Sequence, residues 1–251
     1  SRTKIHRLRS PAKRWIPWLQ FWFLSEVSVN DTKIKDGAIA FNWLQATLLV
    51  GIRPSEWFSA MLLTNVLSPT GERYPWVLEV VSSKKGNFKI TDGETSQDAR
   101  RRLVLHEWPP AQIELIRSFI SQVPVGQKEF KKQYEAIRQT LLKASGVAGF
   151  GDRVIGLYTG SHIFMSEVRR EDKCSPYDLA AMLGHADTRN QNFYGDKDKG
   201  KPREFTYTLS KPWPGLSEKV QKVDLSRHKV TYGSKAIVDK MIKTGEIKVG
   251  M

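Results

Sequence analysis

The chain has almost no cysteine and no long apolar run, and each absence excludes a class of protein. Cys174 is the only cysteine among 251 residues, so an internal disulfide is impossible. With one cysteine and five scattered histidines, no spacing is typical of a zinc site. No apolar stretch approaches the roughly 20 residues that span a bilayer, and the first residues contain no signal-peptide core. We therefore expect no metal, no cofactor and no membrane partner, in a reducing cytosol or nucleoid.

Acidic residues are also few relative to basic ones. The 26 Asp and Glu residues face 40 Lys and Arg, which gives a net charge of +14 and a pI near 9.8. Such a balance is typical of a protein that binds a polyanion, with nucleic acid as the first candidate and a membrane surface as the second. A content of 40% hydrophobic residues at this length suffices for one large domain or two small ones.

The apolar spacing predicts a fold that is mainly α with a small antiparallel β-sheet, an α+β class. Gly51 is expected to end the first helix, and Pro54 to lie in the first turn of the next. The expected elements are helices over 37–50, from 54, and over 111–123 and 133–144, with strands over 76–81 and 103–106 around a turn at 82–87.

Three regions are expected along the chain: a basic segment or linker over 1–36, a catalytic domain over 37–195 and a basic extension over 196–251. The first is either a solvated tail or an arm that contacts phosphates, and it is a candidate remnant of a DNA-binding domain. The last contains apolar residues at helical spacing near 237–242, which either dock on a neighbouring subunit or pack on their own domain. The basic residues of the first segment are Arg2, Lys4, Arg7, Arg9, Lys13 and Arg14.

A motif near the end of the second third carries the most specific signal. The residues 175–178 (SPYD) predict a helix start, and Gly184 predicts its end. His185 follows directly, where its ring can leave the core and reach a ligand. Tyr194 comes after eight intervening residues, and a short helix from 187 would bring it back toward the same pocket. Tyr194 is thus a candidate nucleophile.

Two basic positions upstream are suited to a phosphate site. Arg53 lies at the junction of two expected helices, where its planar fork can grip two phosphate oxygens. Lys84 or Lys85, at a hairpin tip, can give a proton to a departing oxygen. Arg53 or the hairpin lysine alone is more simply explained as a surface charge. The prediction of a phosphate site therefore depends on both together with His185 and Tyr194.

Taken in order, these residues resemble the catalytic domain of the tyrosine recombinase, or phage integrase, family over 37–195. The segment GIRPSEW is similar to the first-arginine box, SSKKG to the catalytic-lysine turn, and SPYDLAAMLGHADTRNQNFYG to the histidine and nucleophile segment. The resemblance implies that Tyr194 forms a 3'-phosphotyrosine link and that Lys84, rather than Lys85, protonates the 5'-oxygen. It implies that Arg53 and His185 bind phosphate oxygens, without metal or nucleotide.

The family's second arginine box departs from the pattern in this chain. Tyr158 stands at the position of its first histidine, and Ser161 stands at the position of its arginine. Losing such a preorganised donor costs on the order of 2.7 to 4 kcal/mol of transition-state stabilisation. Three explanations compete. Ser161 is an engineered substitution, or a natural loss in a member without catalysis, or its effect is compensated by another arginine of the chain. We favour the first. The rescue candidates are Arg153, Arg169 and Arg170.

The resemblance also implies partners and a setting. Double-stranded DNA would be held mainly through its phosphates, with Lys85 and Arg153 among the contacts. A homo-oligomer, a tetramer on paired sites, would act in the cytoplasm or nucleoid of a prokaryote, or for a phage or mobile element. Two alternatives stay open: a recombinase-like DNA-binding protein without catalysis, and a type IB topoisomerase-like enzyme. The spacing from LGH to the tyrosine favours a recombinase.

Overall fold

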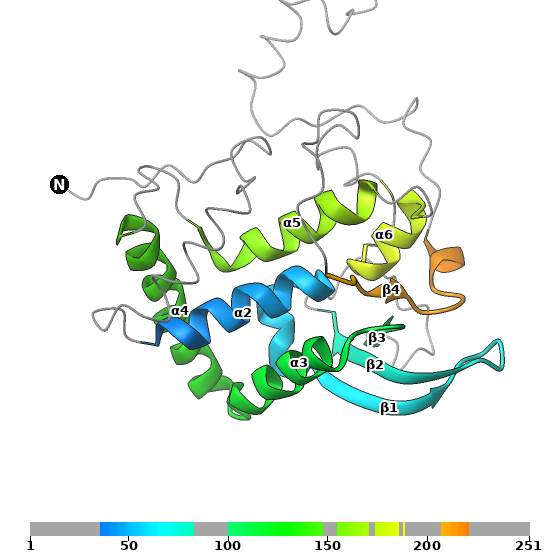
Figure 1. Cartoon of the computed structure of the whole chain (residues 1–251), viewed down its shortest axis with the longest axis horizontal. Coiled ribbons are helices and arrows are strands. Elements are labelled where there is room, and N and C mark those ends of the chain that lie inside the picture. Colours follow the sequence, from blue (N-terminus) through cyan, green and yellow to red (C-terminus); the bar gives the residue numbers. More distant parts are fainter. Residues whose placement is uncertain are drawn as a thin grey trace, which may run out of the picture. The chain divides into compact units, whose positions relative to one another are not determined.

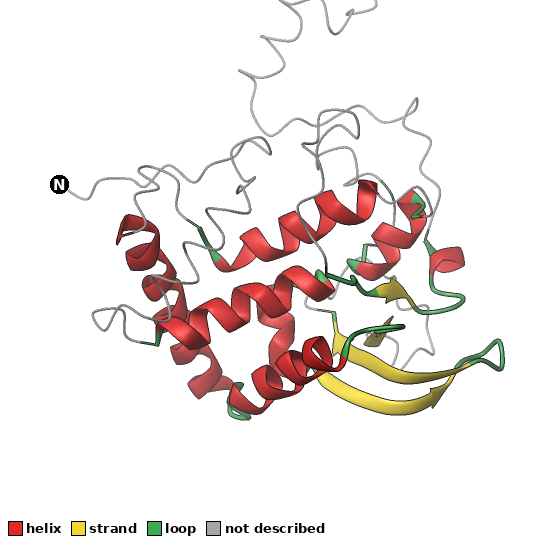
Figure 2. Cartoon of the chain, viewed as in Figure 1, coloured by secondary structure: helices red, strands yellow, loops and turns green. Residues whose placement is uncertain are grey.

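The computed structural model describes residues 36–82, 100–147, 155–170, 174–185, 188 and 207–220. The chain divides into two compact units, 1–221 and 222–251, and every described residue lies in the first. Its helices and a four-stranded antiparallel sheet confirm the expected α+β class (Figures 1 and 2). The helical elements are α2 (Gly37–Val50), η2 (Pro54–Ser59), α3 (Pro110–Gln122), α4 (Gln127–Val147), α5 (Leu157–Arg170), α6 (Pro176–Met182) and η6 (Ser217–Lys219).

Helix α2 is the centre of the helical part. Its sequence is apolar around most of its circumference, which is typical of a helix buried on several sides. Figure 1 shows α2 (blue) beside α5, α3 and α4, and all three contact it. Gly51 ends the helix in the left-handed region, at φ 72°, and its N–H donates to the carbonyl of Thr47 at 2.8 Å. The chain therefore turns sharply into η2, which begins next to Arg53.

Helices α2 and α5 approach closely because two glycines face the contact. A Cβ at Gly160 would lie 2.7 Å from the carbonyl oxygen of Leu44, and one at Gly51 would lie 2.1 Å from the ring of Phe164. Real Cβ atoms do not come so near to other heavy atoms, so only glycine fits at either position. This close packing places the residue after Gly160 directly against the chain that leads to Arg53.

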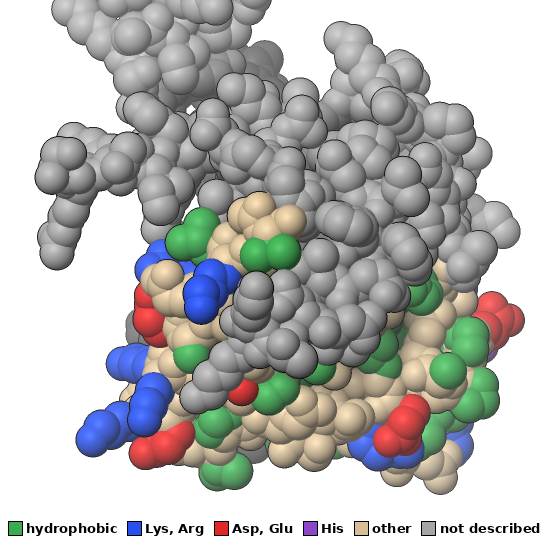
Figure 3. Space-filling model, turned by 60° about the vertical axis from the view of Figure 1, so that its left-hand side comes forward, with side chains coloured by type: hydrophobic (Ala, Val, Ile, Leu, Met, Phe, Trp, Pro, Cys, Tyr) green, Lys and Arg blue, Asp and Glu red, His purple; other side chains and the backbone are tan. Residues whose placement is uncertain are grey.

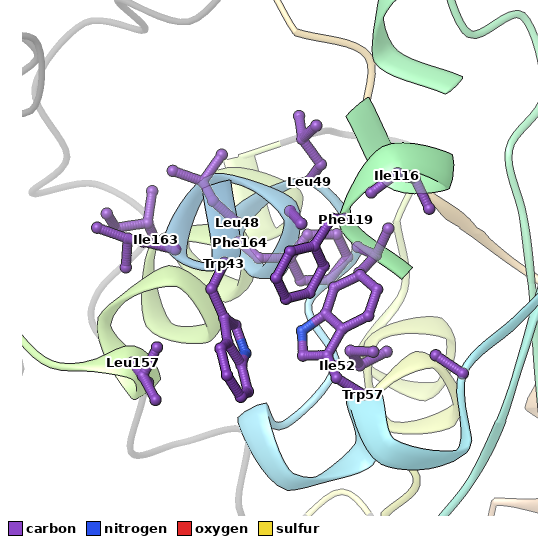
Figure 4. Packing of buried hydrophobic residues seen from close by; sticks show 14 of the residues in the cluster. Trp43, Leu48, Leu49, Ile52, Trp57, Ile116, Phe119, Leu157, Ile163 and Phe164 are labelled. Atoms are coloured by element: carbon purple, nitrogen blue, oxygen red, sulfur yellow. The ribbon is translucent and has the colours of Figure 1, made fainter. Parts of the chain in front are cut away.

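Aromatic side chains fill the space between α2, η2, α3 and α4. Trp43 and Trp57 both lie close to the ring of Phe119, at centroid distances of 5.5 and 4.8 Å (Figure 4). The indole N–H of Trp57 donates to the hydroxyl of Thr47 at 2.8 Å. Aromatic pairs of this kind add about 0.5 to 1.5 kcal/mol each beyond the area that they bury, so this cluster fixes η2 against α2.

The sheet has the order β1-β2-β3-β4, with every neighbouring pair antiparallel. Its strands are β1 (Met61–Leu67), β2 (Arg73–Val81), β3 (Arg100–Val104) and β4 (Lys211–Pro212). Residues 68–72 join β1 to β2 in a turn that includes Gly71 at φ 85°. Strands β2 and β3 flank residues 83–99, which lie outside the described residues together with the expected lysine turn.

Several predicted elements are confirmed and others differ in extent. The helix over 37–50 has the predicted bounds, and a helix begins at Pro54, although it is a 3₁₀ helix. Helix α4 starts at 127 rather than 133, and the return strand covers 100–104 rather than 103–106. Strand β1 was not predicted. Its burial does not alternate regularly along the strand, so the period-2 signal of a half-buried strand is weak.

Residues 207–220 pack on the same core, so the packed part of the chain extends past residue 195. Gln112 exchanges two hydrogen bonds with the backbone of Thr208, at 2.9 and 3.1 Å. Ser210 donates through its backbone N–H to the carbonyl of Leu49 at 3.2 Å, and β4 then pairs with β3. Within the described residues, no helix is both long and apolar enough to cross a bilayer.

Candidate functional site

Arg53 lies at the start of η2 and is held there by Glu56. Its backbone N–H donates to Glu56 Oε2 at 2.7 Å, and its Nη1 donates to Glu56 Oε1 at 2.7 Å. The backbone of Arg53 is extended, at φ −70° and ψ 146°, so the side chain leaves the chain just before the helix turns. With 14% of its side-chain surface exposed, Arg53 has a fixed direction and limited access to solvent.

Glu56 in turn is paired with a second arginine, Arg101 of β3. Two parallel hydrogen bonds join them, from Nη1 to Oε1 at 3.0 Å and from Nη2 to Oε2 at 2.7 Å. The side-chain exposures are 4% for Arg101 and 0% for Glu56. Burial alone would raise the pKa of Glu56, but the charge and hydrogen bonds of Arg101, together with Arg53, outweigh it and lower the pKa to about 2. Glu56 is thus an anion that two arginines share.

Arg101 also reaches the end of α6. Its Nε donates to the carbonyl oxygen of Met182 at 2.9 Å, one of the carbonyls that a helix end leaves without a helical partner. Gly184 lies against the same guanidinium, since a Cβ there would be 2.8 Å from Nη1 and 3.1 Å from Ser82 Oγ. One side chain therefore links η2, β3 and α6 at a single point.

The arginine run 100–102 divides between the two faces of β3. Arg100 and Arg102 both pair with Glu79 of β2, at 2.9 and 2.8 Å, while Arg101 points to the opposite, buried face. Alternate residues of a strand point to opposite faces, so this arrangement follows from the run itself. Sequence reasoning missed Arg101 and Glu56. The signals that would have found them are the middle position of the run and the carboxylate three residues after Arg53.

Helix α6 begins and ends as its sequence predicts. Ser175 Oγ accepts from the N–H of Asp178 at 3.1 Å, and Asp178 accepts from the N–H of Ser175 at 3.0 Å, which is a capping box. At the other end Gly184 has φ 64°, and the N–H of His185 donates to the carbonyl of Ala180 at 2.8 Å. This pattern is the Schellman motif.

His185 lies directly past the helix end, as predicted, but it does not leave the core. The residue is buried, with 5% of its surface exposed. The Schellman hydrogen bond from its N–H folds the chain back over the last turn of α6, which explains this burial. The expectation of a projecting ring is wrong, and a ligand has to approach a recessed imidazole.

Ser161 of α5 contacts the backbone of Ile52, the residue before Arg53. Its hydroxyl donates to the carbonyl oxygen of Ile52 at 2.9 Å, and the residue is buried. Tyr158, three residues earlier, is 48% exposed. The structure thus places Ser161 against the residue that precedes Arg53, and its hydroxyl is engaged in a hydrogen bond between α5 and the chain after α2.

Other predicted site residues lie outside the described residues. They are the nucleophile candidate Tyr194, both hairpin lysines Lys84 and Lys85, Arg153, and the basic residues of 1–36. Arg169 and Arg170 end α5, but their side chains are likewise outside. Among the residues that the structure does describe, no group of His, Cys, Asp and Glu side chains is suited to hold a metal ion.

The charge of the described residues is mixed. On the face that Figure 3 shows, Lys and Arg side chains (blue) are interspersed with Asp and Glu side chains (red). Many of the basic residues in the described ranges are paired, such as Arg117 with Glu114 and Arg138 with Glu135. Most of the net charge of +14 therefore comes from residues outside the described ranges.

Comparison with known proteins adds no relative. Neither a scan against protein-family models nor searches of curated proteins and of solved structures gave a match.

Proposed function

We propose that this chain is the catalytic domain of a site-specific DNA recombinase that cuts and rejoins DNA through a 3'-phosphotyrosine intermediate. The observation that carries the proposal is the link through Arg101 and Glu56 between Arg53 and the end of α6, where His185 follows. Residues 53 and 185 are far apart in the sequence, and both belong to motifs that resemble those of tyrosine recombinases. A fold that brings them to one buried arginine supports a shared phosphate site.

The proposed chemistry uses side chains alone. The phenolate oxygen of Tyr194 attacks the scissile phosphorus, and the 5'-oxygen leaves with a proton from Lys84. Arg53 neutralises the charge of the non-bridging oxygens, and His185 donates a hydrogen bond to one of them. The low exposure of Arg53 and His185 supports a site with little water, in which each of these interactions is stronger than in bulk solvent. The 5'-hydroxyl of another strand then reverses the reaction on a new partner.

Ser161 makes cleavage slow in this proposal. Its hydroxyl already donates to Ile52, so the second box supplies no charge to the phosphate. The same hydrogen bond supports a second candidate function, a recombinase-like protein that binds DNA without cutting it. In that case the hydroxyl of Ser161 only joins α5 to the backbone of Ile52.

A covalent-capture assay distinguishes the two functions. The probe is a pool of nicked DNA duplexes with a randomised central segment, in which loss of the short fragment that bears the released 5'-hydroxyl traps any adduct. We expect wild type to form a slow adduct that Tyr194→Phe abolishes. We expect Ser161→Arg to speed it by about 10² to 10³-fold, as for a restored oxyanion donor.

The matched control is Ser161→Ala, which also removes the hydroxyl but adds no charge. Specific DNA binding without an adduct, from wild type and from Ser161→Arg alike, would contradict the catalytic proposal and favour the binding protein. Relaxation of supercoiled plasmid by the monomer, without paired sites, would instead favour a type IB topoisomerase-like enzyme. The proposed partners, double-stranded DNA and further copies of this chain, are tested by the same pool in a gel-shift assay.

A further inference from the structure

Arg101 donates hydrogen bonds to two elements that lie far from it in the sequence. It donates to both oxygens of Glu56 and to the carbonyl of Met182, and these acceptors lie 45 and 81 residues away along the chain. A buried ion pair is costly to desolvate and often no better than well-packed apolar residues for stability. Stability of the fold alone therefore does not account for the Arg101–Glu56 pair.

The two contacts of Arg101 lead to two different groups of the proposed site. Glu56, on one side, accepts from both the backbone and the side chain of Arg53. Met182, on the other side, is in the last turn of α6, and the chain continues through Gly184 into His185. The guanidinium is planar and its donors have fixed directions. Its orientation therefore sets how Glu56 and the Met182 carbonyl lie relative to each other.

We propose that Arg101 is a positioning residue that holds Arg53 and His185 in one fixed frame for a phosphate group. Its role in catalysis rests on the proposed function, whereas the coupling between Arg53 and His185 does not. Arg101 itself does not bind the phosphate, since it is buried and three of its donors are already used. Arg101 therefore does not take the role of the family's second arginine, at whose position this chain has Ser161.

The residue that follows β2 lies at the same point as Arg101. Strand β3 begins at residue 100 and β2 ends at 81, so both strands border the segment that holds Lys84. Ser82, next to β2, is buried, and its Oγ has no hydrogen-bond partner among the described residues. A Cβ at Gly184 would lie within 3.1 Å of that oxygen. The hairpin base, the buried arginine and the end of α6 therefore meet at one point.

The first test measures His185 without any activity. The ring of His185 is followed by NMR of ¹³C-labelled histidine in the full chain, with the signal assigned by its loss in His185→Gln. Each variant is titrated with inorganic phosphate. We expect Arg101→Met to shift the His185 signal and to weaken its response to phosphate. The matched control, Arg102→Met, removes the neighbouring arginine, which also pairs with a glutamate but on the other face of β3, and should leave both unchanged.

Two further variants protect the test against misfolding. Arg101→Met leaves Glu56 buried without its main partner, so Arg101→Met combined with Glu56→Gln removes both charges together. Arg101→Lys keeps the charge but loses the fork, and we expect it to shift His185 as well. An unchanged His185 signal and phosphate response in folded Arg101 variants overturns the proposal, whatever the protein's activity.

The second test measures the reaction with the nicked duplex pool. We expect the Arg101 variants to form adduct about 10²-fold more slowly than wild type at saturating DNA, because small misplacements of reacting groups have effects of this size. The affinity for DNA should change by less than about threefold, since a duplex is held through many phosphates and only one of them lies at the proposed site. A loss of affinity with an unchanged rate would show that Arg101 has only a structural role. If wild type forms no adduct, the proposed function fails, and the NMR test still decides the positioning role.

Discussion

Gly184 lies in contact with Arg101, at the point where the last turn of α6 ends. A Cβ at position 184 would come within 2.8 Å of Arg101 Nη1, and the backbone there has φ 64°. The glycine thus meets two separate requirements, a left-handed helix end and room for a buried guanidinium. The first is common to many helices, and the second is specific to this site.

We predict that Gly184→Ala destabilises the protein more than a left-handed glycine alone would explain. The matched control is Gly71→Ala, at φ 85°, where a Cβ would meet nothing within 4 Å. The left-handed conformation costs roughly 1 to 2 kcal/mol for a residue with a Cβ, and we expect this loss at position 71. At position 184 the contact with Arg101 should add about 1 kcal/mol or more. Urea unfolding followed by circular dichroism measures both, and equal losses would show that Arg101 moves aside freely.

The pairing of Glu56 predicts a specific dependence of stability on pH. The pKa of Glu56 is lowered from 4.5 to about 2 in the folded protein. Its contribution to stability is therefore present above pH 4.5 and is lost as the pH falls toward 2. Glu56→Gln should lower the free energy of unfolding by about 3 to 5 kcal/mol at neutral pH, because it leaves the charge of Arg101 without its partner.

The measurement is thermal unfolding of wild type and Glu56→Gln between pH 7 and pH 3. The stability difference between them should narrow steadily below pH 4.5, since the unfolded wild-type chain takes up a proton at Glu56 there that the folded protein binds only near pH 2. Glu135→Gln is the control, because Glu135 also pairs with an arginine but is exposed. A constant difference over the whole range would mean that the pKa of Glu56 is the same in the folded and the unfolded protein.

The two most buried tryptophans of the described residues differ in the partner of the indole N–H. Trp57 donates to Thr47, whereas the Nε1 atom of Trp43, also buried, has no hydrogen-bond partner in the described part of the chain. Replacing either by phenylalanine removes similar volume. We predict that Trp57→Phe is the more destabilising by about 1 kcal/mol, because it leaves the Thr47 hydroxyl unpaired. Chemical unfolding of the two variants gives this difference directly, and a larger loss from Trp43→Phe would contradict it.

Asp178 connects the start of α6 with the segment after residue 206. It accepts from Ser175 Oγ at 2.7 Å and from Ser217 Oγ at 2.5 Å. Burial alone would raise the pKa of Asp178, but hydrogen bonds from Ser217 and Ser175 outweigh it and lower the pKa. We predict that Asp178→Asn costs about 1 to 2 kcal/mol, the usual range for a lost cap. A double-mutant cycle with Ser217→Ala should give less than additive losses. Additive losses would show that the two side chains act independently.

The elements nearest to the site were the most predictable from sequence. Helix α2 and the ends of α6 depend on local signals, namely apolar spacing, a serine cap and a glycine at the end, and local signals are visible in the sequence. The hydrogen bonds of Arg101 depend on which face of β3 is buried and on what packs above it. These are properties of the tertiary structure, so the sequence shows a run of three arginines and a carboxylate after Arg53 but not which of them pair.

The burial of His185 was mispredicted for a related reason. The sequence shows that a histidine follows a helix-ending glycine, but its burial depends on the backbone hydrogen bond to Ala180 and on what packs over the end of α6. Strand β1 was missed because its apolar residues do not alternate regularly with polar ones. The roles of Tyr194 and Lys84 stay predictions, since both residues lie outside the described ranges.

The two outer strands of the sheet each carry a residue that opposes further pairing. Strand β4 has two residues, and one of them, Pro212, has no N–H to donate. Strand β1, at the other edge, contains Asn65 at φ 55°, which interrupts the regular extended backbone. Neither edge offers a continuous row of donors and acceptors to a strand from another molecule. Within the described residues, this sheet is therefore expected to resist fibril-like pairing with other molecules even at high protein concentration.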